Sequence, residues 1–264
     1  MPYILTTVNV NGVRAAAKKD HGLLRWLAAT EADAVCLQET RADDKQLATV
    51  LAPVLEQGWH LASAEPAAKG RNGVAVLSRV PADAVRIGFG DPEFADSGRY
   101  LEADFGDLTV ASLYLPSGEV GTERQDEKER FMASFGEHLA KAAASGRDVV
   151  VSGDWNIAHT ERDLKNWKSN QKASGFLPEE RQWLDGVFAE AWVDVVRGLH
   201  PDVDGPYSWW SYRGKAFDND SGWRIDYQVA TADLAERAIA ARVERASSYD
   251  QRWSDHAPVT VEYR

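Results

Sequence analysis

The chain has 264 residues, of which 44% are hydrophobic, and this suffices for one large domain or two small ones with a sizeable core. Its net charge of −11 argues against a general polyanion binder, which usually carries a basic stripe. An enzyme that acts on a polyanion can still be acidic overall, because a metal site needs carboxylates and only one groove must be basic. The single cysteine, Cys36, excludes an intrachain disulfide and predicts a buried thiol in a reducing cytoplasm.

No targeting or membrane segment is visible in the sequence. Residues 1–5 lack a basic segment with a long apolar core, and no apolar run approaches the length of a membrane span. No linker or low-complexity segment divides the chain. We therefore expect one cytoplasmic domain over residues 1–264, with no membrane partner. Nothing in the sequence suggests an obligate oligomer, so we expect a monomer.

Short β-like runs alternate with helical patterns at the start of the chain. Residues 3–10 predict a strand rich in β-branched side chains, residues 22–32 a helix, and residues 34–37 a second strand. A strand, a helix and a strand in this order indicate a βαβ unit. The polar residues that follow both strands then lie where open α/β sheets usually place their sites.

The middle of the chain is richer in strands. Residues 73–78, 100–105 and 108–115 follow one another with turn residues between them, which predicts an antiparallel meander. A long helix is predicted over residues 122–144, because its start is acidic and Gly146 follows as a stop.

The last part of the chain combines strands with a long irregular stretch. Residues 148–152 predict a buried strand that leads directly into Asp154, and Pro178 predicts the first residue of another helix. The stretch 157–177 is unusually long for a loop in a compact domain, and such loops are more often functional than idle. Two further strands are predicted to close the chain, over residues 224–230 and 258–263.

Acids and amides follow the first two predicted strands. Glu39 ends an apolar run, and hard cations such as Mg²⁺ prefer carboxylate oxygens. Asn9 and Asn11 flank a turn before Gly12. Taken singly, each has a structural interpretation that is favoured: a surface glutamate, and asparagines that serve a turn.

A second group of polar residues follows the later strands. Asp154 and Asn156 are separated by one residue, so in an extended segment they face the same way, where the acid can deprotonate water and the amide can donate to a phosphate oxygen. His256, next to Asp255, can stabilise charge on a phosphoryl group, and Asp226 can hold its other nitrogen. The alternatives are a turn for the first pair, and a surface or core residue for the histidine.

The groups matter together more than singly. Cleavage of a phosphodiester by a metal-activated water needs a metal carboxylate, a base for the water, amide or cationic partners for the phosphate, and an oriented histidine. All are present at predicted strand ends, and no nucleophile elbow, Walker loop or zinc spacing competes for them. The sequence therefore predicts a phosphodiesterase.

At this point the chain resembles the exonuclease III family of apurinic/apyrimidinic endonucleases, within the endonuclease/exonuclease/phosphatase superfamily. The resemblance runs over essentially the whole chain. Its motifs are Asn9-Val10-Asn11-Gly12, Leu37-Gln38-Glu39-Thr40, residues 73–79, Tyr114-Leu115-Pro116, Gly153-Asp154-Trp155-Asn156-Ile157, residues 163–166, Gly222-Trp223-Arg224-Ile225-Asp226-Tyr227 and Ser254-Asp255-His256. Two departures stand out: Ser117 where the family often has Asn, and Trp155 where a smaller apolar residue is usual. They leave the balance of endonuclease and exonuclease activity open.

The resemblance implies an α/β fold, a four-layer αββα sandwich of two mixed β-sheets flanked by helices. It implies that Glu39 is the main ligand of Mg²⁺, with Mn²⁺ as the alternative ion, and that Asn11 and Asp255 lie near the metal. It also implies that Asp154 positions or activates the water and that Asn156 helps to place the water and the phosphate. The scissile phosphate is then contacted by His256, held by Asp226, and the phosphate site is completed by Tyr114 and Asn9.

Two further features are implied for DNA recognition. Trp209, Trp223 and Ile225 look like the wall of a pocket for a flipped-out abasic sugar, since a sugar without its base fits a tight apolar pocket that a normal nucleotide cannot enter. The alternative for such tryptophans is core packing. A locally basic loop could follow the DNA backbone, or be a solvated surface loop; its residues are Arg162, Lys165, Asn166, Lys168, Asn170 and Lys172.

The favoured interpretation is a Mg²⁺-dependent DNA-repair nuclease that cuts duplex DNA 5′ to abasic sites and acts as a 3′–5′ exonuclease that trims blocked 3′ ends. One alternative is a phosphatase or phosphodiesterase of the same superfamily that acts on inositol lipids or sphingomyelin. It predicts a membrane-facing loop, which the sequence does not show. A third is a non-catalytic DNA-damage binding module, which would have no use for Glu39, Asp154 and His256 together.

Overall fold

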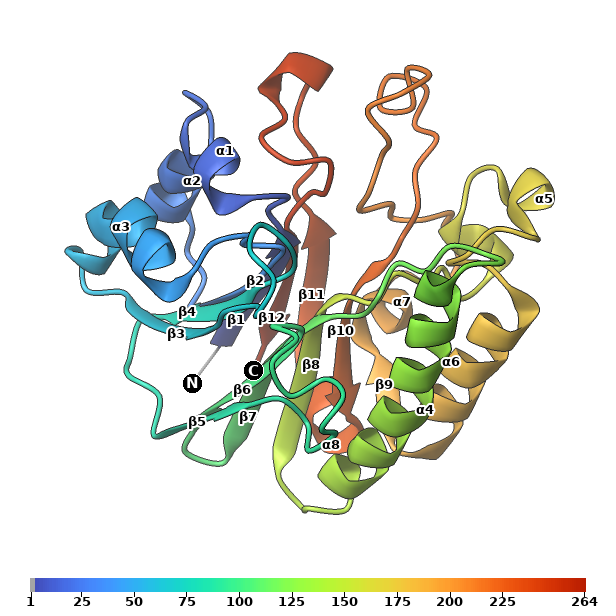
Figure 1. Cartoon of the computed structure of the whole chain (residues 1–264), viewed down its shortest axis with the longest axis horizontal. Helices are drawn as coiled ribbons and strands as arrows, with labels where there is room; N and C mark the ends of the chain where they lie inside the picture. The colour runs from blue at the N-terminus through green and yellow to red at the C-terminus, as the bar shows by residue number, and fades with distance from the viewer. Residues whose placement is uncertain (1–2) are drawn as a thin grey trace.

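The structure is a computed structural model and describes residues 3–264. Two six-stranded β-sheets lie face to face, with helices on both outer faces (Figure 1). In the first sheet the order is β11-β12-β1-β2-β4-β3, and in the second it is β5-β6-β7-β8-β10-β9. Both sheets contain parallel and antiparallel pairs. The predicted four-layer sandwich of two mixed sheets is confirmed.

The strands of each sheet come from both halves of the chain. The first sheet consists of β1 (Tyr3–Asn9), β2 (Ala34–Gln38), β3 (His60–Ala64), β4 (Val74–Ser78), β11 (Ala238–Val243) and β12 (Val259–Tyr263). The second consists of β5 (Ala84–Ile87), β6 (Tyr100–Phe105), β7 (Leu108–Tyr114), β8 (Asp148–Asp154), β9 (Trp192–Asp194) and β10 (Asp226–Thr231).

Helices cover the outer face of each sheet (Figure 1). The first sheet is covered by α1 (Val13–Ala17), α2 (Leu23–Ala29) and α3 (Asp44–Leu55), and the second by α4 (Glu123–Ala143) and α6 (Pro178–Glu190). The shorter elements are η1 (Glu161–Asp163), α5 (Trp167–Asn170), α7 (Val195–Leu199), α8 (Ala232–Ala235) and η2 (Tyr249–Gln251). Within residues 3–264, no helix combines the length and the apolar character that crossing a membrane requires.

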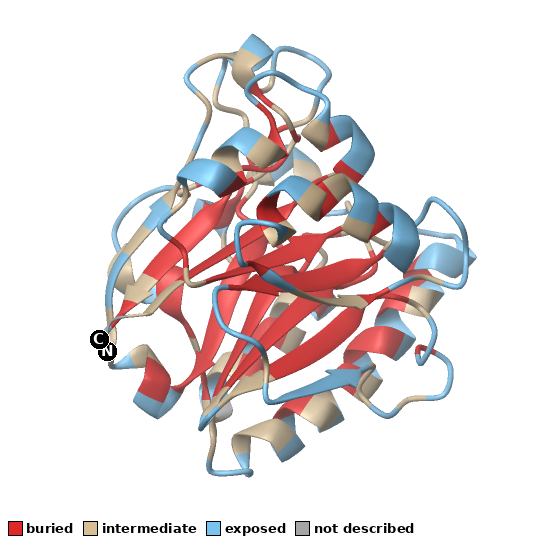
Figure 2. Cartoon of the chain, turned by 90° about the vertical axis from the view of Figure 1, so that its left-hand side faces the viewer, coloured by how far each residue is buried: buried red, intermediate tan, exposed pale blue. Residues whose placement is uncertain are grey.

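The central strands are buried on both faces, as Figure 2 shows in red. Between the sheets, Leu5 and Cys36 of the first sheet belong to one apolar cluster with Val110 and Val150 of the second. Helices cover the other face of each sheet, so successive residues of these strands are buried rather than every second one. Cys36 is buried, as predicted, and is a free thiol.

The predicted βαβ unit is confirmed, because β1 and β2 are parallel and α2 connects them. The predicted antiparallel meander is wrong in its first strand. Residues 74–78 form β4, which pairs with β2 and β3 in the first sheet, whereas β5, β6 and β7 form the meander of the second. All five residues of β4 are buried. A strand without polar alternation carries no sign of the sheet to which it belongs.

One end of the sandwich gathers the ends of several strands. β1, β2, β7 and β8 all finish there, and the antiparallel pairing of β10 with β8 places Asp226 opposite Asp154. The segments 200–222 and 244–258 rise above the same end (Figure 1, orange and red). The polar residues that follow these strands therefore meet at one place.

Candidate active site

A cleft of about 440 Å³ opens at this end of the sandwich. It lies between the two sheets, because its walls come from loops that follow strands of both. Among the residues that line it are Asn11, Glu39, Arg41, Tyr114, Asp154, Asn156, Gly175, Trp209, Trp223, Ile225, Asp255 and His256. The predicted catalytic, metal and pocket residues are thus brought together, with Asn9 and Asp226 directly behind this surface.

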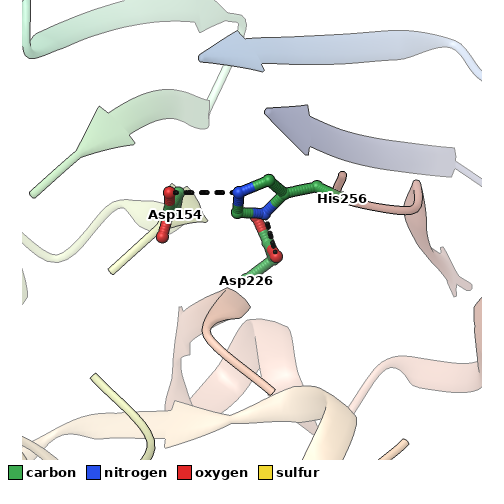
Figure 3. A group of neighbouring side chains, drawn as sticks. All are labelled: Asp154, Asp226 and His256. Carbon is green, nitrogen blue, oxygen red and sulfur yellow. Dashed lines mark hydrogen bonds and ion pairs between the residues drawn. The ribbon is translucent and has the colours of Figure 1, made fainter. Parts of the chain in front are cut away.

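His256 lies between two buried carboxylates (Figure 3). Its Nδ1 is 2.8 Å from Asp226 Oδ2, and its Nε2 is 3.8 Å from Asp154 Oδ2. Asp226 Oδ2 also accepts a hydrogen bond of 2.6 Å from the hydroxyl of Ser208. Asp226 therefore fixes the orientation of the imidazole ring, and Nε2 faces the cleft beside Asp154.

Burial and charge shift the pKa values of this group in ways that suit proton transfer. Burial raises the pKa of Asp154 to about 7, against the attraction of His256. Burial alone would lower the pKa of His256, but the carboxylates of Asp226 and Asp154 outweigh it and raise this pKa to about 10. With these pKa values the imidazole is a cation at neutral pH, and Asp154 can gain or lose a proton close to neutral pH.

Asn9 connects the two sheets at the base of the cleft. It is 0% exposed, and its Nδ2 donates to Glu39 Oε1 at 2.8 Å and to Asp154 Oδ2 at 2.9 Å. Its Oδ1 accepts from the backbone N–H of Asn11, so the turn interpretation of this motif is also correct. Asn11, Glu39 and Asn156 have φ of 47°, 48° and 51°. Residues other than glycine adopt this region only where the surroundings hold them, as at functional sites.

The three predicted metal ligands, Asn11, Glu39 and Asp255, all line the cleft. Asp255 accepts from Asn11 Nδ2 at 2.8 Å and from Trp209 Nε1 at 3.1 Å, and Glu39 Oε2 accepts from Arg41 Nε at 2.9 Å. Carboxylate and amide oxygens are the ligands that Mg²⁺ and Mn²⁺ prefer, so these residues fit such an ion.

A second group in the cleft has ligand types for a metal. Asp154, Asp226 and His256 are buried, and each offers one atom within 4.8 Å of the others. The hydrogen bond between His256 and Asp226 already engages one atom of each. The buried acidic and histidine residues can therefore bind a metal, whereas Glu39 and Asp255 provide the set that is richer in oxygen.

Two predicted phosphate residues occupy the wall nearest β7. Tyr114 ends this strand and is 9% exposed. Asn156 donates its backbone N–H to Asp154 Oδ1 at 2.9 Å and its side-chain Nδ2 to the carbonyl oxygen of Leu115 at 2.8 Å. The backbone of Asn156 thus orients Asp154, a role that the sequence did not suggest.

The three residues predicted to form the apolar wall of the pocket, Trp209, Trp223 and Ile225, all line the cleft. Trp209 forms β-bridges to Trp223 and to His256, and the two indole rings meet edge to face at 82° with centroids 6.2 Å apart. Ile225 lies next to them, is 6% exposed, and also lines the cleft. Trp210, by contrast, is buried against Phe217 outside the cleft. The pocket wall thus directly adjoins the histidine.

The predicted DNA-backbone loop lies apart from the cleft. None of its six residues, all within the described part of the chain, lines the cleft, and five of them are exposed while Asn170 is half-buried. Arg162 donates to the carbonyl oxygen of Pro201 at 2.8 Å, and Asn170 donates to that of Asn166 at 2.8 Å. Lys165, Lys168 and Lys172 are exposed, and the Lys168 ammonium lies over the ring of Trp167, 5.5 Å from its centroid. A contact of this loop with DNA stays a prediction.

Comparison with known proteins identifies the family to which the chain belongs. The model of the Endonuclease/Exonuclease/phosphatase family matches residues 6–256. The chain belongs to this family. An exodeoxyribonuclease of Bacillus subtilis is 36% identical over 257 residues, which are 97% of this chain and 98% of that protein.

Solved structures of this family are also similar. An AP endonuclease from Archaeoglobus fulgidus superposes with a TM-score of 0.89 at 27% identity, and a 3′ phosphatase from Neisseria bound to a product DNA hairpin does so with 0.89 at 28%. Each comparison covers 99% of both chains. The predicted exonuclease III branch of the family is confirmed, as is the predicted enzyme class, a nuclease.

The sequence analysis did not predict one buried cluster of charged residues. Asp163 is 0% exposed and pairs with Arg224 Nε at 2.6 Å and with Arg197. Arg224 also pairs with Asp194 at 2.7 Å. The cluster fastens the long stretch 157–177 to the segment that carries Trp223. The sequence shows that each of these residues is charged, but the partners are far apart along the chain, so it does not show that they pair.

We expect Asp163→Asn to lower the free energy of unfolding by about 3 kcal/mol, because it leaves a buried cation with a weakened partner. Burial would raise the pKa of Asp163, but Arg224 and Arg197 hold it well below its usual range. The stabilisation by the Asp163 carboxylate is therefore fully present above the pKa of an aspartate in the unfolded chain, which is about 4. It is lost as the pH falls below that value toward the lower pKa of the folded state.

Urea unfolding of both proteins between about pH 7 and about pH 3 tests this prediction. The difference in stability shrinks toward the acid end. The control is Glu119→Gln, since Glu119 and Arg124 are 61% and 62% exposed, and it changes stability by less than about 1 kcal/mol. A difference that does not depend on pH would contradict the prediction.

Proposed function

We propose that this protein is a Mg²⁺-dependent DNA-repair nuclease that cleaves duplex DNA 5′ to abasic sites and removes nucleotides or blocking groups from 3′ ends. The observation that carries the proposal is the Asp154–His256 pair, with Nε2 and Oδ2 3.8 Å apart beside the wall of Trp209, Trp223 and Ile225. The AP endonuclease, exodeoxyribonuclease and 3′ phosphatase among the relatives support the same substrate class.

In the proposed mechanism, Asp154 accepts a proton from the attacking water. Asn9 and the backbone N–H of Asn156 hold its two carboxylate oxygens, so the base is oriented before substrate arrives. The His256 cation donates from Nε2 to a scissile phosphate oxygen and offsets the charge that develops there. As the water oxygen bonds to phosphorus, the bond from phosphorus to the 3′ oxygen breaks, and this oxygen leaves as a hydroxyl after it takes up a proton from solvent. Glu39, with Asn11 and Asp255, would hold the metal, which stabilises charge on the phosphate when it is bound.

We further propose that residues 1–264 form one catalytic domain that acts as a monomer in the cytoplasm, with nucleoid DNA as substrate. Both sheets contribute residues to the cleft, so neither half of the chain is a complete site. The exposed cations of Lys165, Lys168 and Lys172 would contact the DNA backbone. Size-exclusion chromatography combined with light scattering tests the oligomeric state.

The first test is incubation with a labelled duplex that carries one abasic analogue, beside the same duplex with a normal base. We expect cutting at the abasic position with Mg²⁺ and none with a chelator. A ladder from the 3′ end of both duplexes would show that exonuclease activity dominates. Bound but uncut abasic DNA in the presence of Mg²⁺ would contradict the enzymatic proposal and favour a binding module.

The role of the apolar wall has a test of its own. We expect Trp223→Ala to reduce the preference for abasic over normal DNA by about tenfold or more, because the wider pocket also admits a nucleotide with its base. The control is Trp183→Ala on α6, since Trp183 is also half-buried but packs against Trp155 outside the cleft. The ratio of kcat/KM for the two duplexes is the measurement. Equal ratios in wild type and Trp223→Ala would refute a selective pocket.

A further inference from the structure

A fully buried lysine lies behind the cleft. Lys128 of α4 is 0% exposed, and its Nζ is 2.7 Å from Oε1 of Glu180 on α6, which is 1% exposed. Lysine and glutamate are almost never fully buried unless they are paired. An apolar pair of the same size is often as stable as a buried ion pair. The charged pair therefore needs a reason other than stability.

One reason is its contact with the backbone of Asn156. Lys128 Nζ donates to the carbonyl oxygen of Asn156 at 2.9 Å. Asn156 has a φ of 51°, which its surroundings must hold, and its backbone N–H donates to Asp154 Oδ1 at 2.9 Å. The buried ammonium thus fixes the peptide unit on one side of Asn156, while the unit on its other side orients the proposed base.

The glutamate holds a second segment of the cleft. Its Oε2 accepts from the backbone N–H of Gly175 at 2.7 Å and of Leu177 at 3.1 Å. The hydroxyl of Ser174 lies 3.2 Å from Glu180 Oε1 and donates to the carbonyl oxygen of Ser117 at 2.9 Å. Ser117, Ser174 and Gly175 all line the cleft. The ion pair therefore joins three segments of its wall: residues 115–118, 154–157 and 174–177.

We propose that Lys128 and Glu180 are positioning residues for phosphodiester cleavage, which hold Asn156, and through it Asp154, in the geometry of the reaction. The inference rests on the proposed function and adds residues that do not touch the substrate. A neutral pair fills the same space but lacks charge-assisted hydrogen bonds to the Asn156 carbonyl and the Gly175 N–H. A displacement of about 1 Å at a reacting group costs roughly a hundredfold in rate.

The test uses the double variant Lys128→Met/Glu180→Gln, because it leaves no unpaired buried charge and so separates positioning from stability. The matched control is Arg130→Met/Glu93→Gln. It removes an ion pair between Arg130 of the same helix and Glu93 of the loop after β5, whose side chains are 54% and 44% exposed. For each protein we would measure kcat and KM on the abasic duplex, the Tm, and amide hydrogen exchange over residues 154–158 and 174–177.

We expect the double variant to fold, with a Tm within a few degrees of wild type. Its kcat should fall by roughly tenfold to a hundredfold with little change in KM, and the amides of residues 154–158 and 174–177 should exchange faster. The control should match wild type in all four. A folded double variant with wild-type kcat and exchange would overturn the proposal. Wild-type protein that cuts no DNA would overturn the proposed function instead, and the exchange data alone would then decide on the positioning of the loops.

Discussion

Asp154→Asn is expected to lower kcat on an abasic duplex by about a thousandfold or more, because the variant cannot accept the proton of the attacking water. Asparagine keeps the size of the side chain, and its oxygen can still accept from Asn9 or from the backbone of Asn156. A defect in kcat with a normal fold would therefore report on chemistry. The measurement is single-turnover cleavage with saturating enzyme.

The same residue predicts a pH dependence for the wild-type enzyme. Asp154 must be ionised to act as a base, and burial raises its pKa to about 7. We expect kcat/KM to rise with pH up to about 7 and to level off above it. The residual activity of Asp154→Asn should lack this rise. A wild-type profile that is flat from about pH 5 to about pH 8 would argue against Asp154 as the base.

Stability gives the control for this variant. The pKa of Asp154 in the folded protein lies above that of an unfolded aspartate, so the ionised carboxylate destabilises the fold at alkaline pH. Asparagine removes that cost but also loses one hydrogen bond. We expect a Tm near or above that of wild type at about pH 8. A large drop in Tm would mean that the loss of kcat reflects unfolding.

The predicted part of the fold is the part that is buried on both faces. Strands such as β1, β2 and β8 are buried along most of their length, are rich in apolar residues, and were located to within two residues. The edge strands β3, β5, β9 and β11 were all missed. They are short or largely exposed, and all four residues of β5 are exposed. A strand that is very short, or whose residues are mostly exposed, has too few apolar positions to show a period in its sequence.

The candidate site follows the same division. Residues at or directly after the end of a strand, such as Asp154 and Glu39, were predicted as members of a site, and both line the cleft. Their supporting partners were not, because Ser208 and Lys128 reach the site from a distant loop and from a helix. Such contacts depend on tertiary packing, which a single sequence does not display. The family resemblance predicted the residues that act in the reaction, but not the residues that hold them in place.

Asp226→Asn is the second large expected effect. Asp226 Oδ2 accepts a hydrogen bond of 2.6 Å from the hydroxyl of Ser208 and lies 2.8 Å from His256 Nδ1. An asparagine oxygen at the same place preserves this geometry and removes only the negative charge. Loss of this charge lowers the pKa of His256 from about 10 toward its ordinary value. The ring then loses its proton near neutral pH and binds the phosphate less well. We expect kcat/KM to fall by roughly a hundredfold to ten-thousandfold.

The shape of the pH profile distinguishes this explanation from a general loss of order. Because its pKa is raised to about 10, His256 keeps its proton in the folded enzyme at neutral pH and loses it only as the pH rises through about 10. Wild-type activity should therefore stay level between about pH 8 and about pH 9, whereas Asp226→Asn should decline from about pH 7 upward. Ser208→Ala, which leaves the carboxylate in place, should keep the level profile. If both variants declined alike, the hydrogen-bond network rather than the charge of Asp226 would control His256.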